Sequence, residues 1–251
     1  MKKEQHTSSV TSQEWLDHFS KVLDCESLPV SDNEVENNDL ASTFGPGESV
    51  DILDAVITAS EVQAAIKVLK DNKAAGPDGL SSDFFRYSAP CDSAPCDLHF
   101  LTEYFNKLFN TGTFPSEWSE SVILPIYKKG DFNSPNNYRG ISLLNVGGKL
   151  YSYILNKRLT QWIEDNKMLN EAQAGFRQGY STIDHVFTLL ALVQKQLLSH
   201  GKLYVCFIDF KKAFDLVDRN TLWLILKKNG SEAKCIKQSK VCMKMLRPEF
   251  E

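Results

Sequence analysis

Apolar residues recur at helical spacing in several stretches of the chain. Residues 15–23 place their apolar side chains on one face, and the same spacing returns after Thr58, where Thr58 and Glu61 form the pattern of a capping box. The pattern predicts three further and longer helices, over residues 98–112, 147–166 and 182–201. We therefore expect a core that is largely helical.

Strand-like patterns interrupt the helices at two places. The stretches 122–126 (VILPI) and 140–144 (GISLL) are separated by turn-forming residues, which predicts a hairpin with a long loop. Residues 202–210 (KLYVCFIDF) are almost continuously apolar and predict a buried strand, with Asp218 and Gly230 placed to begin and end the helix that follows. This mixture predicts an α+β fold in which helices pack on a small sheet.

Composition divides the chain into three parts. Residues 1–57 hold the first predicted helix and an acidic segment rich in Pro and Gly, which predicts a partly disordered linker. Residues 58–230 carry the regular patterns and are the predicted folded domain. Residues 231–251 are basic with weak apolar periodicity, and we expect this tail to have little order.

Length and composition are those of a soluble protein of 251 residues, with 42% hydrophobic and 24% charged residues. No apolar run approaches the roughly 20 residues of a membrane span, and the N-terminus lacks the apolar centre of a signal peptide. The six cysteines show no zinc spacing and are expected to be reduced thiols. The sequence predicts an intracellular protein, in the nucleus or the cytoplasm, with no membrane partner.

Charge is segregated along the chain. Residues 1–66 carry three Lys/Arg against thirteen Asp/Glu, whereas residues 67–251 carry twenty-five against nineteen. A basic body favours an anionic partner, although a surplus of lysine also serves simply to solvate a surface.

Basic side chains at two places in the sequence suit such a partner. Lys128, Lys129 and Arg139 flank the predicted hairpin loop, so folding brings them together as a group that suits a polyphosphate. The alternative is a solvated loop. Arg177 lies beside Phe176 among glycines, a composition that suits a single nucleic-acid strand, although Phe176 could equally belong to the core.

A carboxylate ends the predicted buried strand. Asp209 is costly there unless a lysine, a helix N-terminus or a metal ion compensates its charge. A hard cation such as Mg²⁺ is often held at this position, and phosphates can fill its other coordination sites. Asp215 could serve as a second ligand or as a turn or capping residue.

Several stretches, taken together and in order, resemble the reverse transcriptase domain of non-LTR (LINE-type) retrotransposons. They are GPDGL, FPSEWSESVILPIYKKGD, NYRGISLL, QAGFRQGYSTID and YVCFIDFKKAFDLVDRNTLW. The resemblance implies the fingers and the first part of the palm of a right-hand polymerase, preceded by a helical linker. It also implies RNA-directed DNA polymerase activity, which is a nucleotidyl transfer, with Mg²⁺, an RNA template, a DNA primer and deoxynucleotide triphosphates.

The resemblance also assigns roles to single residues. Asp209 corresponds to the first catalytic aspartate, and Phe210 to the residue whose backbone carbonyl joins it at the metal. Phe214 corresponds to the bulky residue that rejects ribonucleotides. The residues that correspond to those holding the incoming nucleotide are Lys128, Lys129 and Arg139. A motif that lies near the template in the family contains Phe176 and Arg177.

The sequence departs from the family pattern in one respect that matters for catalysis. The family has a second pair of adjacent aspartates in a palm hairpin, and no such pair occurs in the 251 residues. A single carboxylate cannot hold two metal ions in catalytic geometry. We therefore expect a truncated, inactive reverse transcriptase domain. The alternatives are a non-catalytic RNA-binding protein and an unstable remnant of an open reading frame.

Overall fold

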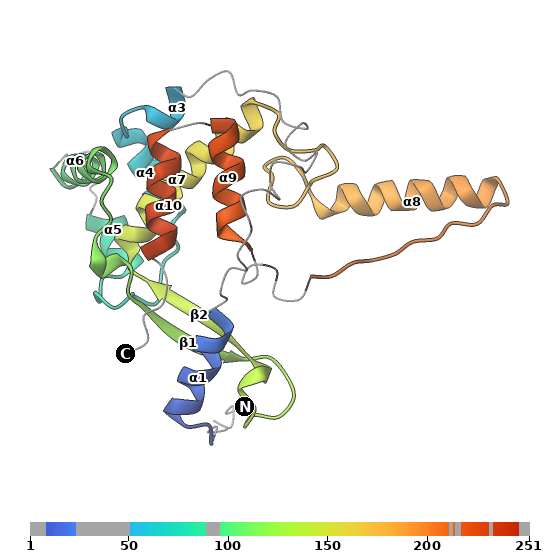
Figure 1. The fold of residues 1–251 in the computed structure, drawn as a ribbon, viewed down its shortest axis with the longest axis horizontal. Coiled ribbons are helices and arrows are strands. Elements are labelled where there is room, and N and C mark those ends of the chain that lie inside the picture. The colour runs from blue at the N-terminus through green and yellow to red at the C-terminus, as the bar shows by residue number, and fades with distance from the viewer. Residues whose placement is uncertain are drawn as a thin grey trace.

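The structure is a computed structural model, and it describes residues 9–23, 51–88, 96–210, 213, 217–230 and 233–245. Figure 1 shows a body of packed helices, a hairpin that extends from one end of it, and a long helix, α8, that projects from its side. In chain order the elements are α1 (Ser12–Leu23), α3 (Asp51–Asp54), α4 (Ala59–Val68), α5 (Ser82–Ser88), α6 (Cys96–Thr111), η2 (Ser116–Trp118), β1 (Ser121–Tyr127), η3 (Pro135–Asn137), β2 (Tyr138–Leu144), α7 (Val146–Asp165), α8 (Thr182–Leu198), α9 (Arg219–Gly230) and α10 (Lys234–Met245). The predicted α+β class is confirmed.

The core is built around α7. Its side chains Tyr151, Leu155 and Trp162 are buried, and α4, α6 and α10 pack against it. The ring of Phe105 in α6 lies 5.4 Å from the ring of Tyr151, between ring centres. Because α7 begins directly after β2, the same core also anchors the base of the hairpin. No helix in the described part of the chain is long and apolar enough to cross a membrane.

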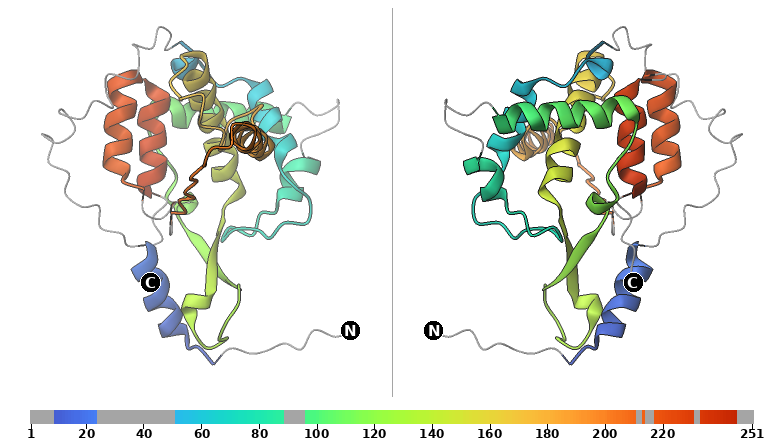
Figure 2. Two further views of the ribbon diagram at one scale, coloured as in Figure 1. Left: turned by 90° about the vertical axis from the view of Figure 1, so that its right-hand side faces the viewer. Right: turned by 90° about the vertical axis from the view of Figure 1, so that its left-hand side faces the viewer.

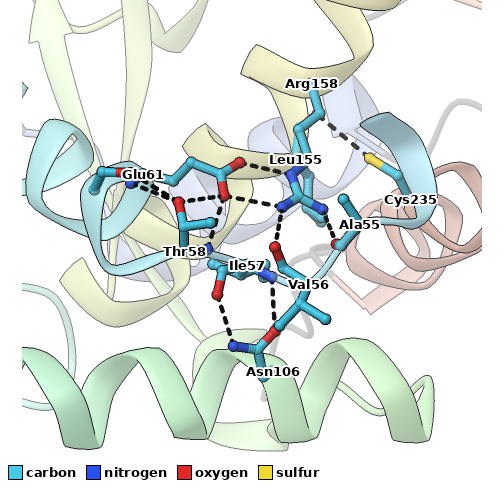
Figure 3. Close-up of polar contacts among 10 residues, drawn as sticks. Ala55, Val56, Ile57, Thr58, Glu61, Asn106, Leu155, Arg158 and Cys235 are labelled. Atoms are coloured by element: carbon cyan, nitrogen blue, oxygen red, sulfur yellow. Dashed lines mark hydrogen bonds and ion pairs between the residues drawn. The ribbon is translucent and has the colours of Figure 1, made fainter. Parts of the chain in front are cut away.

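A buried arginine ties α7 to the chain segment that precedes α4 (Figure 3). Arg158 is 4% exposed and pairs with Glu61, with Nε to Oε1 at 2.7 Å and Nη2 to Oε2 at 2.9 Å. It also donates to the backbone carbonyls of Ala55 and Val56. Glu61 accepts from the backbone N–H and the hydroxyl of Thr58, so the predicted capping box is confirmed. One carboxylate therefore joins the helix cap to the buried guanidinium.

The hairpin forms as predicted, and α1 covers one of its faces. β1 and β2 pair antiparallel, with Leu124 opposite Ile141. On the covered face, the Trp15 ring of α1 meets the Tyr138 ring edge-on at 4.7 Å, and Phe19 is buried. On the other face, Leu124 and Ile141 are 49% and 42% exposed. Figure 2 shows α1 lying along the hairpin, away from the helical body.

The segment predicted to be a poorly ordered tail contains a core helix, so this prediction is wrong for residues 234–245. In α10, Cys235, Ile236 and Cys242 are buried against α7 and its neighbours. Burial raises the pKa of both thiols to about 12. Thiols with so high a pKa stay protonated and pack as small apolar groups.

The predicted strand over residues 202–210 is also wrong. The segment has no regular structure, and each of its residues is exposed, including Phe207 at 83% and Ile208 at 78%. Figure 1 shows it running back from the far end of α8 toward the body. An apolar run becomes a strand only when it pairs with other strands, and the single hairpin among the described residues does not pair with it.

Candidate nucleic-acid interface

The tip of the hairpin is an ordered loop. Its ends are joined by a hydrogen bond from the N–H of Lys128 to the carbonyl of Asn137 at 2.9 Å. The Tyr127 ring stacks on Phe132 with 4.0 Å between centres, and its hydroxyl donates to the carbonyl of Gly130 at 2.6 Å. Gly130 adopts φ 104°, a conformation that favours glycine. These contacts fix the backbone that carries the basic side chains.

Three cations lie at this end of the hairpin. Lys128 and Lys129 follow β1, and Arg139 lies opposite Ile126 in β2, on the face that α1 leaves uncovered. All three are exposed, and none forms an ion pair with another described residue. Asp131 lies in the same loop, where its carboxylate accepts from a backbone N–H within the loop. The tip is therefore an exposed basic surface with one local carboxylate.

The base of the hairpin is locked to the GPDG turn. The buried Asn145 accepts from the N–H of Asp78 at 3.1 Å and donates to the carbonyl of Glu117. A Cβ at Gly76 would lie 2.4 Å from Asn145 Oδ1 and 2.7 Å from the carbonyl carbon of Leu144, so only glycine fits this close approach. The GPDG turn thus packs against the base of the hairpin and fixes its position.

A hollow of about 300 Å³ opens beside the base of the hairpin. Burial lowers the pKa of Lys149, and the Asp78 carboxylate opposes that shift. The hollow is lined by Trp118, Leu144, Gly148, Lys149, Ser152, Tyr153 and Asn156.

The second predicted cation, Arg177, is engaged within the protein. Its Nε and Nη2 donate to the two carboxylate oxygens of Glu164 at 2.9 and 2.7 Å, and its side chain is 9% exposed. Nη1 donates to the carbonyls of Asn170 and Gln173 at 3.1 and 3.3 Å. The guanidinium also lies over the ring of Tyr180, 4.3 Å from its centre.

Phe176 does not belong to the core. It is 91% exposed and adopts φ 62°, which is rare for an aromatic residue. The alternative that placed it in the core is therefore wrong. The loop that ends at Tyr180 holds this ring toward solvent.

The structure does not bring the two predicted basic groups together. The hairpin precedes α7, and the loop that carries Phe176 and Arg177 follows it. A helix of 20 residues is about 30 Å long, so the two groups lie at opposite ends of α7. Figure 1 shows the same separation between the hairpin and the start of α8.

Asp209 and Phe210 lie on the exposed, irregular segment. Among the described residues, no three His, Cys, Asp or Glu side chains are grouped so that they could hold a metal ion. The described part of the chain therefore does not fit a complete Mg²⁺ site. Phe214 and Asp215 lie outside the described residues.

Comparisons with known proteins all indicate the same family. Residues 126–246 match the family described as reverse transcriptase (RNA-dependent DNA polymerase). The chain is 31% identical over 162 residues to the probable RNA-directed DNA polymerase from transposon BS of Drosophila melanogaster, covering 64% of this chain and 17% of that protein.

Two further relatives agree with that match. The uncharacterized 149 kDa protein of transposon TX1 from Xenopus laevis is 30% identical over 171 residues, 68% of this chain and 12% of that protein. The RNA-directed DNA polymerase from mobile element jockey of D. melanogaster is 29% identical over 164 residues, 65% of this chain and 17% of that protein. The chain thus matches less than a fifth of the length of each of these relatives. The match reaches residue 246, so it includes α10.

Proposed function

We propose that the chain is part of a reverse transcriptase domain of the kind found in non-LTR retrotransposons, and that its hairpin tip binds the phosphates of a nucleotide or nucleic acid. One observation carries this proposal. Lys128 and Lys129 follow β1 at the ordered loop and Arg139 lies at the start of β2, all three are exposed, and none of them is neutralised by an ion pair within the described residues. Exposed cations on a fixed backbone suit phosphate oxygens, because the backbone that carries them needs little further ordering on binding.

The three cations have different parts in this proposal. Arg139 presents a planar fork that can bind two phosphate oxygens at once, whereas Lys128 and Lys129 act as point charges. Phe214 is proposed to face the sugar of the incoming nucleotide and to exclude a 2′-hydroxyl. The loop of Phe176 and Arg177 is proposed to lie on the template side.

For the complete enzyme we propose DNA synthesis on an RNA template from a DNA primer, with deoxynucleotide triphosphates and Mg²⁺. The contribution of this chain to the metal would be the carboxylate of Asp209 and the backbone carbonyl of Phe210. Mg²⁺ would supply charge stabilisation to the reacting phosphate. Because the second pair of adjacent aspartates found in the family does not occur in the 251 residues, we infer that these residues alone do not synthesise DNA. We also propose that the protein acts in the nucleus or the cytoplasm.

The proposed organisation follows from the same family. Residues 1–57 are the proposed linker, and the proposed domain of fingers and first palm residues begins at residue 58. Leu53 and Ile57 already belong to the core around α7, so the packed body begins before that boundary. The helix α10 extends that domain beyond the proposed boundary at residue 230, because it shares the core of α7.

A second candidate is an RNA-binding protein without any catalytic role. It is favoured by the contrast between the ordered basic tip and Asp209, which lies on an irregular segment. The third alternative, an unstable remnant, is favoured by the exposed apolar side chains of α8, such as Phe187 at 70% and Leu198 at 85%. The core around α7 argues for stable folding of the remainder.

We expect the purified chain to bind an RNA template annealed to a DNA primer without extending the primer. Binding is measured by fluorescence anisotropy, and extension is measured on a gel with Mg²⁺ and deoxynucleotides. An authentic reverse transcriptase in parallel shows that the substrate is competent. Extension by the chain itself would contradict the inferred inactivity, and absence of any binding would contradict the proposed role of the tip.

A further inference from the structure

We propose that Arg177 is a positioning residue, which holds its loop so that the Phe176 ring can stack on an unpaired base of a single nucleic-acid strand. The inference rests on the proposed function, because it specifies how the template side makes contact. It differs from the prediction drawn from sequence, which counted Arg177 among the cations that suit an anionic partner.

The guanidinium of Arg177 is already occupied. Its three nitrogens donate four hydrogen bonds, two to Glu164 and one each to the carbonyls of Asn170 and Gln173. The hydrogen bonds that Arg177 donates to Glu164 raise the pKa of Arg177 above its ordinary value and lower the pKa of Glu164 below its own. A phosphate could reach this side chain, 9% exposed, only after the ion pair opened. Arg177 is therefore poorly placed to bind a strand directly.

The same contacts define the shape of the loop. Glu164 lies in the last turn of α7, and Asn170 and Gln173 lie in the chain that leaves it. The ring of Tyr180 covers the other side of the guanidinium, two residues before α8 begins. One side chain thus connects the end of α7, the middle of the loop and the start of α8. Loss of it would release all three from one another.

Phe176 is the residue that this arrangement presents. Its neighbour in sequence, Arg177, is fixed, and the N–H of Arg177 donates to the carbonyl of Ala174 at 3.5 Å, which closes a tight turn. Within this turn the backbone of Phe176 has a φ of 62°, and the residue is 91% exposed. An unfavourable backbone conformation persists only where surrounding contacts impose it. An exposed aromatic ring on a fixed turn offers a face to any base, because stacking does not depend on base identity.

The test uses the full chain and a 12-nucleotide single-stranded RNA that contains 2-aminopurine, whose fluorescence falls when it stacks. Phe176→Ala is expected to weaken binding about tenfold and to abolish the fluorescence change, with the salt dependence unaltered. Phe100→Ala is the matched control, because Phe100 is an exposed ring, 67% exposed, on α6. This control is expected to bind as the unmodified chain does.

Two kinds of variant test the role of Arg177: one removes its charge, and the other exchanges it with its partner Glu164. Arg177→Gln is expected to lose the fluorescence change while the slope of log affinity against log salt stays the same. A phosphate contact would instead lower that slope by about one. The exchange Arg177→Glu with Glu164→Arg restores an ion pair with the partners reversed, and is expected to recover at least half of the fluorescence change that Arg177→Glu alone abolishes.

The outcomes separate this inference from the proposed function. If the unmodified chain binds RNA in a salt-dependent manner but Phe176→Ala is without effect, the inference is overturned and the proposed function stands. A reduced slope for Arg177→Gln, or no recovery in the exchange variant, also overturns it. If the unmodified chain does not bind RNA, the proposed function itself fails.

Discussion

Replacement of Arg158 by methionine is expected to lower the free energy of unfolding by about 3 kcal/mol. Arg158 is buried, and its guanidinium satisfies the Glu61 carboxylate together with the carbonyls of Ala55 and Val56 (Figure 3). Methionine fills a similar volume but supplies no donor. The loss is large because partly buried acceptors are left without their partner. Chemical denaturation followed by circular dichroism measures it.

The matched control is Arg86→Met. Arg86 pairs with Asp71 at 3.1 Å and also donates to one backbone carbonyl, that of Leu69, but both side chains of the pair are more exposed, at 30% and 41%. An ion pair of this kind contributes up to about 1 kcal/mol, so the control should lose far less stability. Equal losses for the two variants would contradict the structural role assigned to Arg158.

The same network predicts how stability depends on pH. Burial alone would raise the pKa of Glu61, but hydrogen bonds from Arg158 and Thr58 outweigh it and lower the pKa below 4.5. A lowered pKa stabilises the fold above the ordinary value, and this contribution is lost as the pH falls through the folded-state pKa. Stability should therefore decline below about pH 4.5, and the decline should be smaller in Arg158→Met.

Removal of residues 231–251 is expected to abolish cooperative unfolding. α10 buries Cys235, Ile236 and Cys242 against the central helix α7. Its first N–H donates to the carboxylate of Asp54 at 2.6 Å, and the buried Gln238 donates to the carbonyl of Thr113 at 2.7 Å. Without α10, one side of α7 would face water, and the remaining core would lack its packing partner.

Thermal unfolding followed by circular dichroism tests the second prediction. The shortened chain should lose signal gradually with temperature, whereas the full chain should show one transition. Lys240→Ala is the control, because Lys240 is an exposed residue of the same helix. A sharp transition in the shortened chain would show that α10 is dispensable to the core.

Local patterns in the sequence predicted much of the fold. The apolar stripes gave the helices around the core, Thr58 and Glu61 gave a capping box, and the turn-rich stretch between 126 and 140 gave the hairpin. These features depend on neighbours within a few residues. Asp218 was also predicted correctly as the cap of α9, since it accepts from the N–H groups of the first turn.

The errors concern partners that are distant in sequence. The apolar run 202–210 suits a strand, but strand formation requires a pairing partner that periodicity does not reveal. The apolar stripe of α10 was weak because two of its buried positions, Cys235 and Cys242, are cysteines among lysines. Arg158 gave no signal, because its partner Glu61 lies 97 residues away.

The candidate site was predictable to the same extent. The hairpin pairing puts Arg139 opposite Ile126, and the two lysines follow β1 directly, so their presence at one end of the hairpin follows from the turn alone. The pairing of Arg177 with Glu164 does not, because thirteen residues and a helix end separate them. Composition suggested a surface for nucleic acid, whereas only coordinates could reveal which cations were available to bind.

The most direct test of the basic tip is the salt dependence of RNA binding by the chain and by its Lys128→Ala, Lys129→Ala, Arg139→Ala triple variant. If these side chains bind phosphates, the triple variant should bind RNA at least tenfold more weakly at 100 mM salt, and its slope of log affinity against log salt should be shallower by about two to three. Equal affinity and equal slope for the two proteins would place the nucleic-acid surface elsewhere.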